Sequence, residues 1–282
     1  MTYRVPLQDM AFLARSQDTE QQELLLNEAV RMAQQQWLPT NATGDTEGCQ
    51  ISNGKVELAQ DIVQVFRQYA EAGWMGLTLP ERWGDQQQSE VLGSFVAEML
   101  TSSNHALSML PALTMSACRA IISHGSETLR DTYLPPIIAG RWTATMCMTE
   151  AHCGSDLGLV RSRAEADQDA YRIHGSKIFI SYGSHNASEN IIHLALARLP
   201  DAPAGVKGLS LFLVPEKLQD STGLWQQENG VHCIGIEEKM GIHASPTCSL
   251  SFENAKGYLV GEAHGGIKAM FTMMNEMRLG TC

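Results

Sequence analysis

The stretch Met146-Cys147-Met148-Thr149-Glu150-Ala151-His152-Cys153-Gly154-Ser155-Asp156-Leu157-Gly158 joins an apolar, strand-like beginning to a small polar loop. Gly154 and Gly158 lack a Cβ atom, so the backbone N–H groups of this loop can come close to an anion. The hydroxyl of Ser155 can donate to a phosphate, and that of Thr149 can donate to the edge of a heteroaromatic ring. Most loops rich in Gly and Ser are plain turns, so this stretch alone leaves both interpretations open.

Before this stretch, apolar residues recur at helical spacing, which predicts a helical domain. Pro39 should end the first helix, and the polar run 40–54 should form a loop. Pro111 should open a helix that ends near Gly125.

After this stretch, short apolar runs rich in β-branched residues alternate with Gly, Pro and Asp, which predicts strands. These runs are 178–180, 191–199 and 209–214, and 248–252 has the pattern of another strand. Residues 162–166 and 170–174 can pair across the polar turn Asp167-Gln168-Asp169. Helical spacing returns from Gly266. The order of these patterns predicts an α+β protein, with a helical domain, a β domain and an interrupted final helix.

Composition excludes several classes of protein. The chain of 282 residues carries a formal net charge of −11 and has no block rich in Lys and Arg, so we expect no nucleic-acid partner. The number of cysteines, 7, is odd and no CxxC pair occurs, which favours a reducing cytoplasm over a disulfide framework. Residues 1–17 do not form a secretory signal, and we expect no stretch of the roughly 18 apolar residues that a membrane span needs.

The opening stretch resembles the acyl-CoA dehydrogenase signature T-E-P-x-A-G-S-D-x-G. Ala151 stands where the signature has proline and Cys153 where it has alanine, and neither departure removes a ligand group. Other segments are similar to the same family in the same order along the chain. They are Ala72–Leu77 with Pro80–Gly84, Tyr133–Pro135 with Gly140–Trp142, Gly175–Ser181 (G-x-K-x-[WF]-I-[ST]) and Lys239–Thr247 (K-x-G-x-[RK]-x-S-x-T). The branch that the chain resembles most is that of the larger enzymes similar to 3-methylmercaptopropionyl-CoA dehydrogenase.

This resemblance implies a fold with three parts. Residues 1–143 should form an N-terminal all-helical domain, and residues 144–260 a β-barrel-like middle domain that docks flavin and acyl-CoA. Residues 261–282 should begin a C-terminal helical domain that is truncated here.

The resemblance also implies a cofactor, FAD, and roles for particular residues. Met148 and Thr149 would bond the flavin ring, Ser155 would lie by the FAD pyrophosphate and the acyl-CoA, and Phe179 would pack on the ring. The implied cofactor-binding residues are Met146, Met148, Thr149, Gly154, Ser155, Phe179, Ile180 and Ser181, with Ser181 near flavin N5. The implied substrate-binding residues are Ser155, Asn275 and Arg278.

The implied reaction is α,β-dehydrogenation of an acyl-CoA thioester to a trans-2-enoyl-CoA, with electrons passing to an electron-transfer flavoprotein. Relatives form homodimers or homotetramers. The family's catalytic base is a glutamate of the C-terminal domain, so no catalytic residue is assigned here, and the chain alone should bind FAD weakly without turnover. Glu150 lies in the docking loop and is not assigned as the base. An acyl-CoA oxidase, a non-catalytic flavoprotein and a DNA-associated relative of the same fold are the alternatives.

No metal site is expected. His152 next to Cys153, and His232 next to Cys233, belong to no set of four ligands at the spacing of a tetrahedral site. In the Lys239–Thr247 motif, His243 stands where the family commonly has a basic residue, and the sequence leaves its role open.

Overall fold

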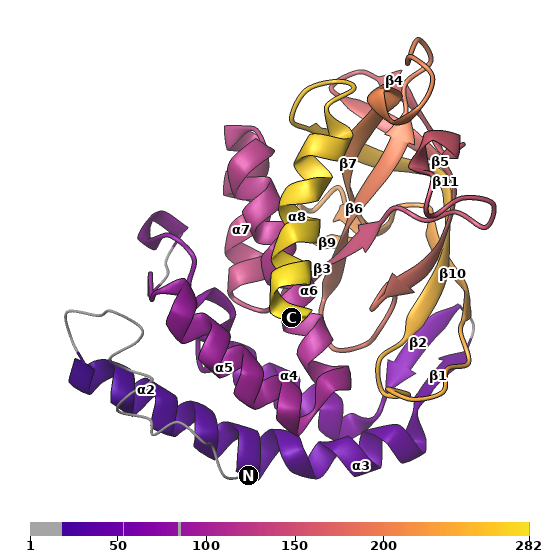
Figure 1. Ribbon diagram of the computed structural model, residues 1–282. Helices are drawn as coiled ribbons and strands as arrows, with labels where there is room; N and C mark the ends of the chain where they lie inside the picture. The colour runs from indigo at the N-terminus through magenta and orange to yellow at the C-terminus, as the bar shows by residue number, and fades with distance from the viewer. Residues whose placement is uncertain (1–18, 53, 84–85, 282) are drawn as a thin grey trace.

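The computed structural model describes residues 19–52, 54–83 and 86–281 of the chain. Helices form one side of the molecule and strands the other, and helix α8 (Gly266–Thr281) packs between them, against α6 and strand β7 (Figure 1). The expected order of a helical domain, a sheet-rich domain and a final helix is therefore confirmed. The expectation about a secretory signal concerns residues 1–17, which lie outside the described part.

The helical domain extends to Ile138. Its elements are α2 (Thr19–Met32), the π-helical turn η1 (Ala33–Trp37), α3 (Leu38–Glu47), the hairpin β1 (Cys49–Ser52) and β2 (Lys55–Leu58), α4 (Gln60–Glu71), the 3₁₀ turns η2 (Trp74–Gly76) and η3 (Glu81–Trp83), α5 (Glu90–Ser103), α6 (His105–His124) and α7 (Glu127–Ile138). The side chains of Ser89, Asn104 and Ser126 cap α5, α6 and α7, because each accepts a hydrogen bond from the backbone N–H three residues on.

Two sequence predictions in this domain are wrong. Pro39 does not end a helix: it lies in the first turn of α3, and the chain before it is already helical through the π-helical turn η1. The run 40–54, expected to be a loop, forms most of α3 and then the β1–β2 hairpin. Packing explains this helix, because a Cβ atom on Gly44 would lie 2.9 Å from Cβ of Ala244, so the glycine lets α3 approach the sheet domain closely.

Helix α6 also begins earlier than the sequence predicts. Pro111 lies inside it rather than at its start, because Asn104 caps the helix about two turns upstream. By length and composition alone, α6 is long and apolar enough to cross a membrane. The expectation that no stretch would be so is therefore wrong. Of its most apolar window, 67% is buried inside the protein, as in the core helix of a globular domain.

The sheet domain begins at Trp142. Its elements are β3 (Trp142–Cys147), the 3₁₀ turn η4 (Leu157–Leu159), β4 (Arg163–Asp167), β5 (Ala170–Ser181), β6 (Asn190–Arg198), the 3₁₀ turn η5 (Val206–Gly208), β7 (Leu209–Pro215), β8 (Lys217–Gln219), β9 (Trp225–Glu228), β10 (Val231–Ile236) and β11 (Thr247–Val260). The main sheet has the order β10-β11-β5-β4-β6-β3, and β7 pairs with both β11 and β6. The pairings β11–β5, β5–β4, β4–β6, β6–β7 and β7–β11 form a closed circuit, which makes the sheet barrel-like.

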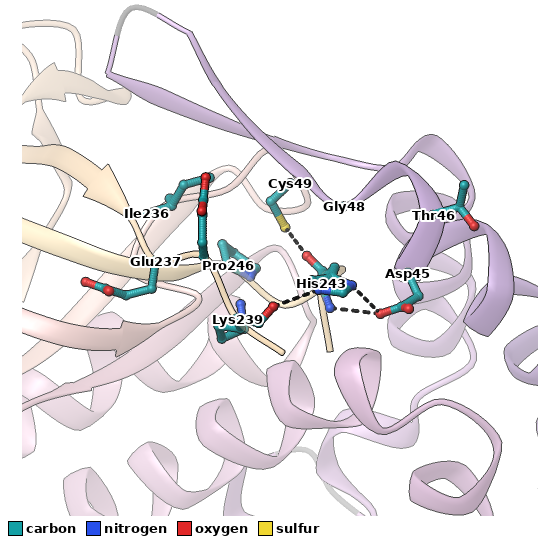
Figure 2. Close-up of a pocket in the computed structure, with 10 residues that line it drawn as sticks. Asp45, Thr46, Gly48, Cys49, Ile236, Glu237, Lys239, His243 and Pro246 are labelled. Carbon is teal, nitrogen blue, oxygen red and sulfur yellow. Dashed lines mark hydrogen bonds and ion pairs between the residues drawn. The ribbon is translucent and has the colours of Figure 1, made fainter. Parts of the chain in front are cut away.

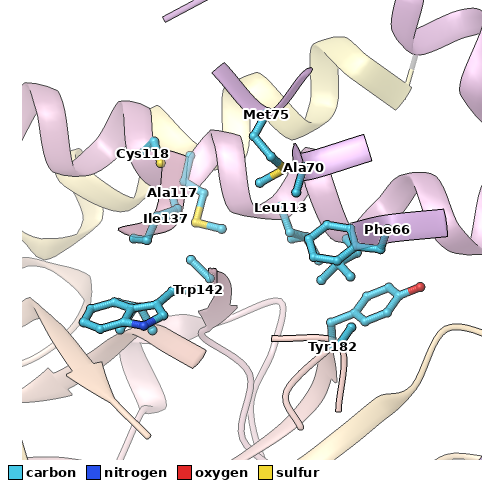
Figure 3. Packing of buried hydrophobic residues seen from close by; sticks show 14 of the residues in the cluster. Phe66, Ala70, Met75, Leu113, Ala117, Cys118, Ile137, Trp142 and Tyr182 are labelled. Atoms are coloured by element: carbon cyan, nitrogen blue, oxygen red, sulfur yellow. The ribbon is translucent and has the colours of Figure 1, made fainter. Parts of the chain in front are cut away.

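The expected hairpin across Asp167-Gln168-Asp169 is confirmed by the antiparallel pairing of β4 with β5. Strand β3 pairs in parallel with β6 at the sheet edge and lies against α6. A continuous core joins the two domains, in which Trp142 and Tyr182 of the sheet domain belong to the same cluster as Phe66 and Leu113 of the helices (Figure 3). The site described next therefore rests on a rigid, shared core.

Candidate functional site

Strand β3 leads out of the sheet into the loop 148–162. The side chains of Met146 and Met148 are half-buried and pack against the core shared with the helices. Thr149, the next polar residue, is also half-buried, and Ser155 is exposed farther along the loop. The stretch that opens the sequence analysis thus begins in the core and reaches solvent at its glycine-containing part.

Glu150 closes the base of this loop. Its carboxylate accepts hydrogen bonds from the backbone N–H groups of Arg161 (2.8 Å) and Ser162 (3.0 Å) and from the Ser162 hydroxyl (2.6 Å). The ammonium of Lys177 lies 2.8 Å from Oε1, and the two side chains are 5% and 1% exposed. One carboxylate therefore ties the start of the loop both to its end and to strand β5.

The Glu150 carboxylate is ionised at neutral pH. Burial alone would raise the pKa of Glu150, but the charge of Lys177 and the hydrogen bonds from Lys177, Ser162 and Arg161 outweigh it and lower the pKa to about 2. Burial lowers the pKa of Lys177, and Glu150 opposes this change. A carboxylate held in this way does not take up a proton near neutral pH.

Two further side chains fasten the loop. His152 Nε2 lies 3.0 Å from the carbonyl oxygen of Leu159, across the loop. Arg198, at the end of β6, donates from Nε to Val160 O (2.8 Å) and from Nη2 to Gly158 O (2.6 Å). The same guanidinium also donates to the carbonyl groups of Gly205 (3.0 Å) and Pro203 (3.2 Å), so it joins the loop to the β6–β7 connection.

The outer part of the loop contains backbone N–H groups without a hydrogen-bond partner among the described residues. The N–H groups of Gly154 and Ser155 make no hydrogen bond to any residue within the described ranges. A Cβ atom on Gly154 would lie 3.2 Å from Cγ2 of Thr149, so the glycine allows the loop to fold back over Thr149. Unpaired N–H groups on a fastened, exposed loop can bind an anion.

A β-bulge turns Phe179 out of strand β5. Leu250 of β11 pairs with Lys177 and Cys248 pairs with Ile180, so Ser249 alone faces both Ile178 and Phe179. Phe179 has φ = 60°, which is uncommon for a residue with a side chain, and its ring is 58% exposed. Bulges and left-handed residues of this kind concentrate at functional sites, where they re-aim a side chain.

The loop and the bulged strand meet, as the sequence predicts. The N–H of Ile178 donates to the carbonyl oxygen of Thr149 (2.9 Å), and the Lys177 ammonium donates to that of Met148 (3.1 Å). The half-buried Ser181 lies two residues after Phe179 on the same strand. Ile180 is buried in the sheet core, so its backbone alone could reach a ligand.

The other residues singled out from the sequence lie elsewhere. Asn275 and Arg278 are exposed on α8, and the Arg278 guanidinium lies 5.5 Å from the ring centre of Phe271. No hydrogen bond or ion pair joins either residue to the loop 148–162 in the part of the chain that the structure describes. Their role at an acyl-CoA site stays a prediction.

Glu150, His152 and Cys153 place one metal-binding atom each within 4.8 Å of one another. The Glu150 carboxylate already binds Lys177, Ser162 and Arg161, and His152 Nε2 faces a carbonyl oxygen. The side chains of Glu150 and His152 therefore hold the loop in place, which gives the cluster a structural explanation.

The sequence did not reveal Arg198, the Glu150–Lys177 pair or the bulge. The ion pair joins residues 27 positions apart, and the Arg198 contact with Gly158 joins residues 40 apart. The available signal was that Glu150 and Lys177 lie in two motifs of the same family, which are expected to belong to one site.

Comparison with known proteins agrees with this fold. A model described as "Acyl-CoA dehydrogenase, N-terminal domain" matches residues 19–141, and one described as "Acyl-CoA dehydrogenase, middle domain" matches residues 145–255. The chain belongs to the acyl-CoA dehydrogenase family. The domain boundaries at 143 and 260 stay predictions.

Individual relatives refine this picture. The 3-methylmercaptopropionyl-CoA dehydrogenase of Ruegeria pomeroyi is 39% identical over 99% of this chain and 50% of its own length, which agrees with the expected branch. A butyryl-CoA dehydrogenase of Syntrophomonas wolfei is 34% identical over 86% of this chain and 42% of its own length. The chain spans about half the length of the curated relatives it matches. An acyl-CoA dehydrogenase from Bacillus anthracis, solved in complex with FAD, has the same fold, with a TM-score of 0.75, 20% identity, and coverage of 98% of this chain and 43% of that one.

Proposed function

We propose that the chain supplies the flavin- and CoA-docking part of an FAD-dependent acyl-CoA dehydrogenase, which converts an acyl-CoA thioester into a trans-2-enoyl-CoA. The observation that carries this proposal is the meeting of the loop and the bulge. Phe179 presents an exposed ring on the strand whose Ile178 is bonded to Thr149, at the base of a loop with unpaired N–H groups.

The residues present fit FAD. A flat aromatic face, hydroxyl groups beside it and an anion-binding loop are the features that an isoalloxazine ring and a pyrophosphate require. Phe179 would pack on the ring, and Thr149 and Ser181 would bond its edge. The N–H groups of Gly154 and Ser155 and the Ser155 hydroxyl would bind phosphate oxygens. Met146, Met148 and Ile180 would contribute packing and backbone groups.

Bound FAD would supply a ring that accepts a hydride from the substrate. The chain's own residues would orient that ring and hold the acyl-CoA beside it, with Ser155, Asn275 and Arg278 as the proposed substrate contacts. Glu150 is a poor candidate for the base, because it is buried, paired with Lys177 and holds a pKa of about 2. We therefore place the base in a part of the whole protein that this chain does not contain.

The whole protein's partners belong to the same proposal. Electrons would pass to an electron-transfer flavoprotein, and the protein would act as a homodimer or homotetramer in the cytoplasm. The six described cysteines are free thiols, in line with a reducing compartment.

Flavin binding is the direct test. We expect FAD added to the purified chain to bind, with a change in flavin fluorescence, and Phe179→Ala and Ser155→Ala to weaken binding by about tenfold each, the value of one good contact. Phe271→Ala is the matched control, since Phe271 is another exposed aromatic residue (40%) that lies on α8. Equal affinity in all four proteins would overturn the proposed site.

Substrate separates the alternatives. Under anaerobic conditions, an acyl-CoA should bleach the flavin in the full-length protein but not in this chain, and bleaching by this chain alone would show that it contains a base. Rapid reoxidation in air with release of peroxide would favour the oxidase. Binding without bleaching in the full-length protein would favour a non-catalytic flavoprotein. A gel shift with a steep salt dependence would favour the DNA-associated relative.

A further inference from the structure

A pocket of about 600 Å³ lies where α3 of the helical domain meets the loop between β10 and β11 (Figure 2). His243, whose role the sequence left open, reaches across it. Its Nδ1 lies 2.8 Å from Oδ1 of Asp45, and its backbone N–H donates to the same oxygen at 3.1 Å. The Cys49 thiol donates to the His243 carbonyl oxygen at 3.2 Å. Three contacts thus join this one residue to the helical domain.

The second ring nitrogen fixes the charge of His243. Nε2 lies 2.8 Å from the carbonyl oxygen of Lys239, which can only accept a hydrogen bond. Nδ1 faces a carboxylate oxygen of Asp45, which is also an acceptor when ionised. Both contacts are hydrogen bonds only if both nitrogens carry a proton, so this arrangement requires the imidazolium form.

The loop that His243 anchors continues into the proposed flavin strand. The carbonyl oxygen of Pro246 accepts a hydrogen bond from the N–H of Tyr182 (2.8 Å), and Thr247 pairs with Ser181. The Lys239 ammonium donates to the carbonyl oxygen of Ser245 (2.7 Å), which holds the loop in a tight fold. A shift of His243 would therefore be passed to Ser181 through a short, hydrogen-bonded segment.

We propose that His243 and Asp45 form a latch that is complete only when His243 is protonated, and that His243 acts as a positioning residue for the end of strand β5 that carries Ser181. The consequence for flavin rests on the proposed function, whereas the latch itself does not.

Several other charged and titratable groups face His243 in this pocket. They are Asp45 from α3, the Cys49 thiol from β1, and Glu237, Glu238 and Lys239 from the loop before β11. Burial raises the pKa of Cys49 to about 11, with Lys239 opposing, so this group stays a neutral thiol between pH 6 and 8. Three carboxylates and one ammonium are the charged groups that remain around the pocket.

The latch is modest in strength because its side chains are 39% and 53% exposed. Exposed ion pairs change an equilibrium roughly twofold to fivefold, and salt weakens them. Histidine side chains change charge between pH 5 and 8, so the coupling should be stronger at pH 6 than at pH 8.

A double-mutant cycle tests the latch. Unfolding in urea at low salt is measured for the wild type, Asp45→Asn, His243→Gln and the double variant. We expect a coupling of roughly twofold to fivefold in the folding equilibrium at pH 6 and a smaller coupling at pH 8. His243→Arg carries a permanent charge and should retain coupling to Asp45 at pH 8.

The exposed helix pair Arg31–Glu28 is the matched control, because neither group changes charge between pH 6 and 8 and its coupling should be constant. The FAD dissociation constant is the second measurement. In the wild type it should be lower at pH 6 than at pH 8, by no more than the roughly twofold to fivefold coupling of the latch. In His243→Arg the dissociation constant should be the same at both pH values. Absence of coupling at pH 6, or equal coupling at both pH values, would overturn the latch. Failure of every protein to bind FAD would overturn the proposed function while the urea cycle still decides the latch.

Discussion

Lys177→Met should destabilise the protein strongly, because it leaves the Glu150 carboxylate buried without a countercharge. The two side chains are 1% and 5% exposed and lie 2.8 Å apart. The pKa of Glu150 falls from an ordinary 4.5 to about 2. At about 1.4 kcal/mol per pKa unit, this difference corresponds to roughly 3 kcal/mol at neutral pH for all the groups that stabilise the carboxylate, Ser162 and Arg161 included, so it is an upper value for Lys177. Loss of one partner of a buried ion pair generally costs about 3–5 kcal/mol, so both arguments give the same magnitude.

Urea unfolding at pH 7, followed by tryptophan fluorescence, measures this loss. Lys207→Met is the matched control, because Lys207 is exposed, and it should change stability by no more than about 0.5 kcal/mol. The double variant Lys177→Met with Glu150→Gln should recover part of the loss, since no unpaired charge remains. A loss below about 1 kcal/mol in Lys177→Met, the scale of an exposed pair, would refute the reasoning.

Acid should remove the contribution of Glu150. The pKa of Glu150 is lowered from 4.5 to about 2 in the folded protein, so the carboxylate stabilises the fold fully above pH 4.5 and loses this effect as the pH falls towards 2. Over this pH range the urea midpoint should drop more steeply in the wild type than in Glu150→Gln. Gly175→Ala should lower the free energy of unfolding by at least about 2 kcal/mol, because Gly175 has φ = 140° and a Cβ atom there would lie 2.3 Å from Ser162 Oγ. The control Gly235→Ala, whose Cβ atom would meet open space, should be nearly neutral. Equal urea midpoints for the two variants would contradict this prediction. Arg198→Gln should speed proteolysis within residues 154–160 and weaken FAD binding, because Arg198 holds the carbonyl groups of Gly158 and Val160. An unchanged cleavage rate would argue against this role of Arg198.

The sequence predicts the fold where local pattern and tertiary packing agree. The β4–β5 hairpin follows from two short segments on either side of a polar turn, and Gln168 at the centre of that turn adopts φ = 55°, as such turns require. Helix α3 was missed because Thr, Asn, Gly and Asp dominate its sequence and favour turns. Contacts of Gly44 with Ile62 and Ala244, which are distant in sequence, stabilise it instead.

The candidate site shows the same division. The meeting of Thr149 with the Phe179 strand could be expected, because two motifs of one family belong to one fold. The bulge that exposes Phe179 could not be expected, since it depends on the register of β11, about 70 residues later. Likewise, Glu150 could be assigned as a loop-closing residue only once Lys177 and Ser162 lay beside it.

The contact of α6 with α8 has a consequence for how the chain is made. His124 Nε2 lies 2.8 Å from Thr272 Oγ1, and Arg119 pairs with Glu276 at 2.9 Å, although the first two residues are 148 positions apart. During synthesis, α6 would leave the ribosome long before its partner and would carry an uncovered apolar flank meanwhile. A nascent chain halted before α8 should therefore be held by chaperones, and the helical domain should become resistant to protease only after α8 has emerged.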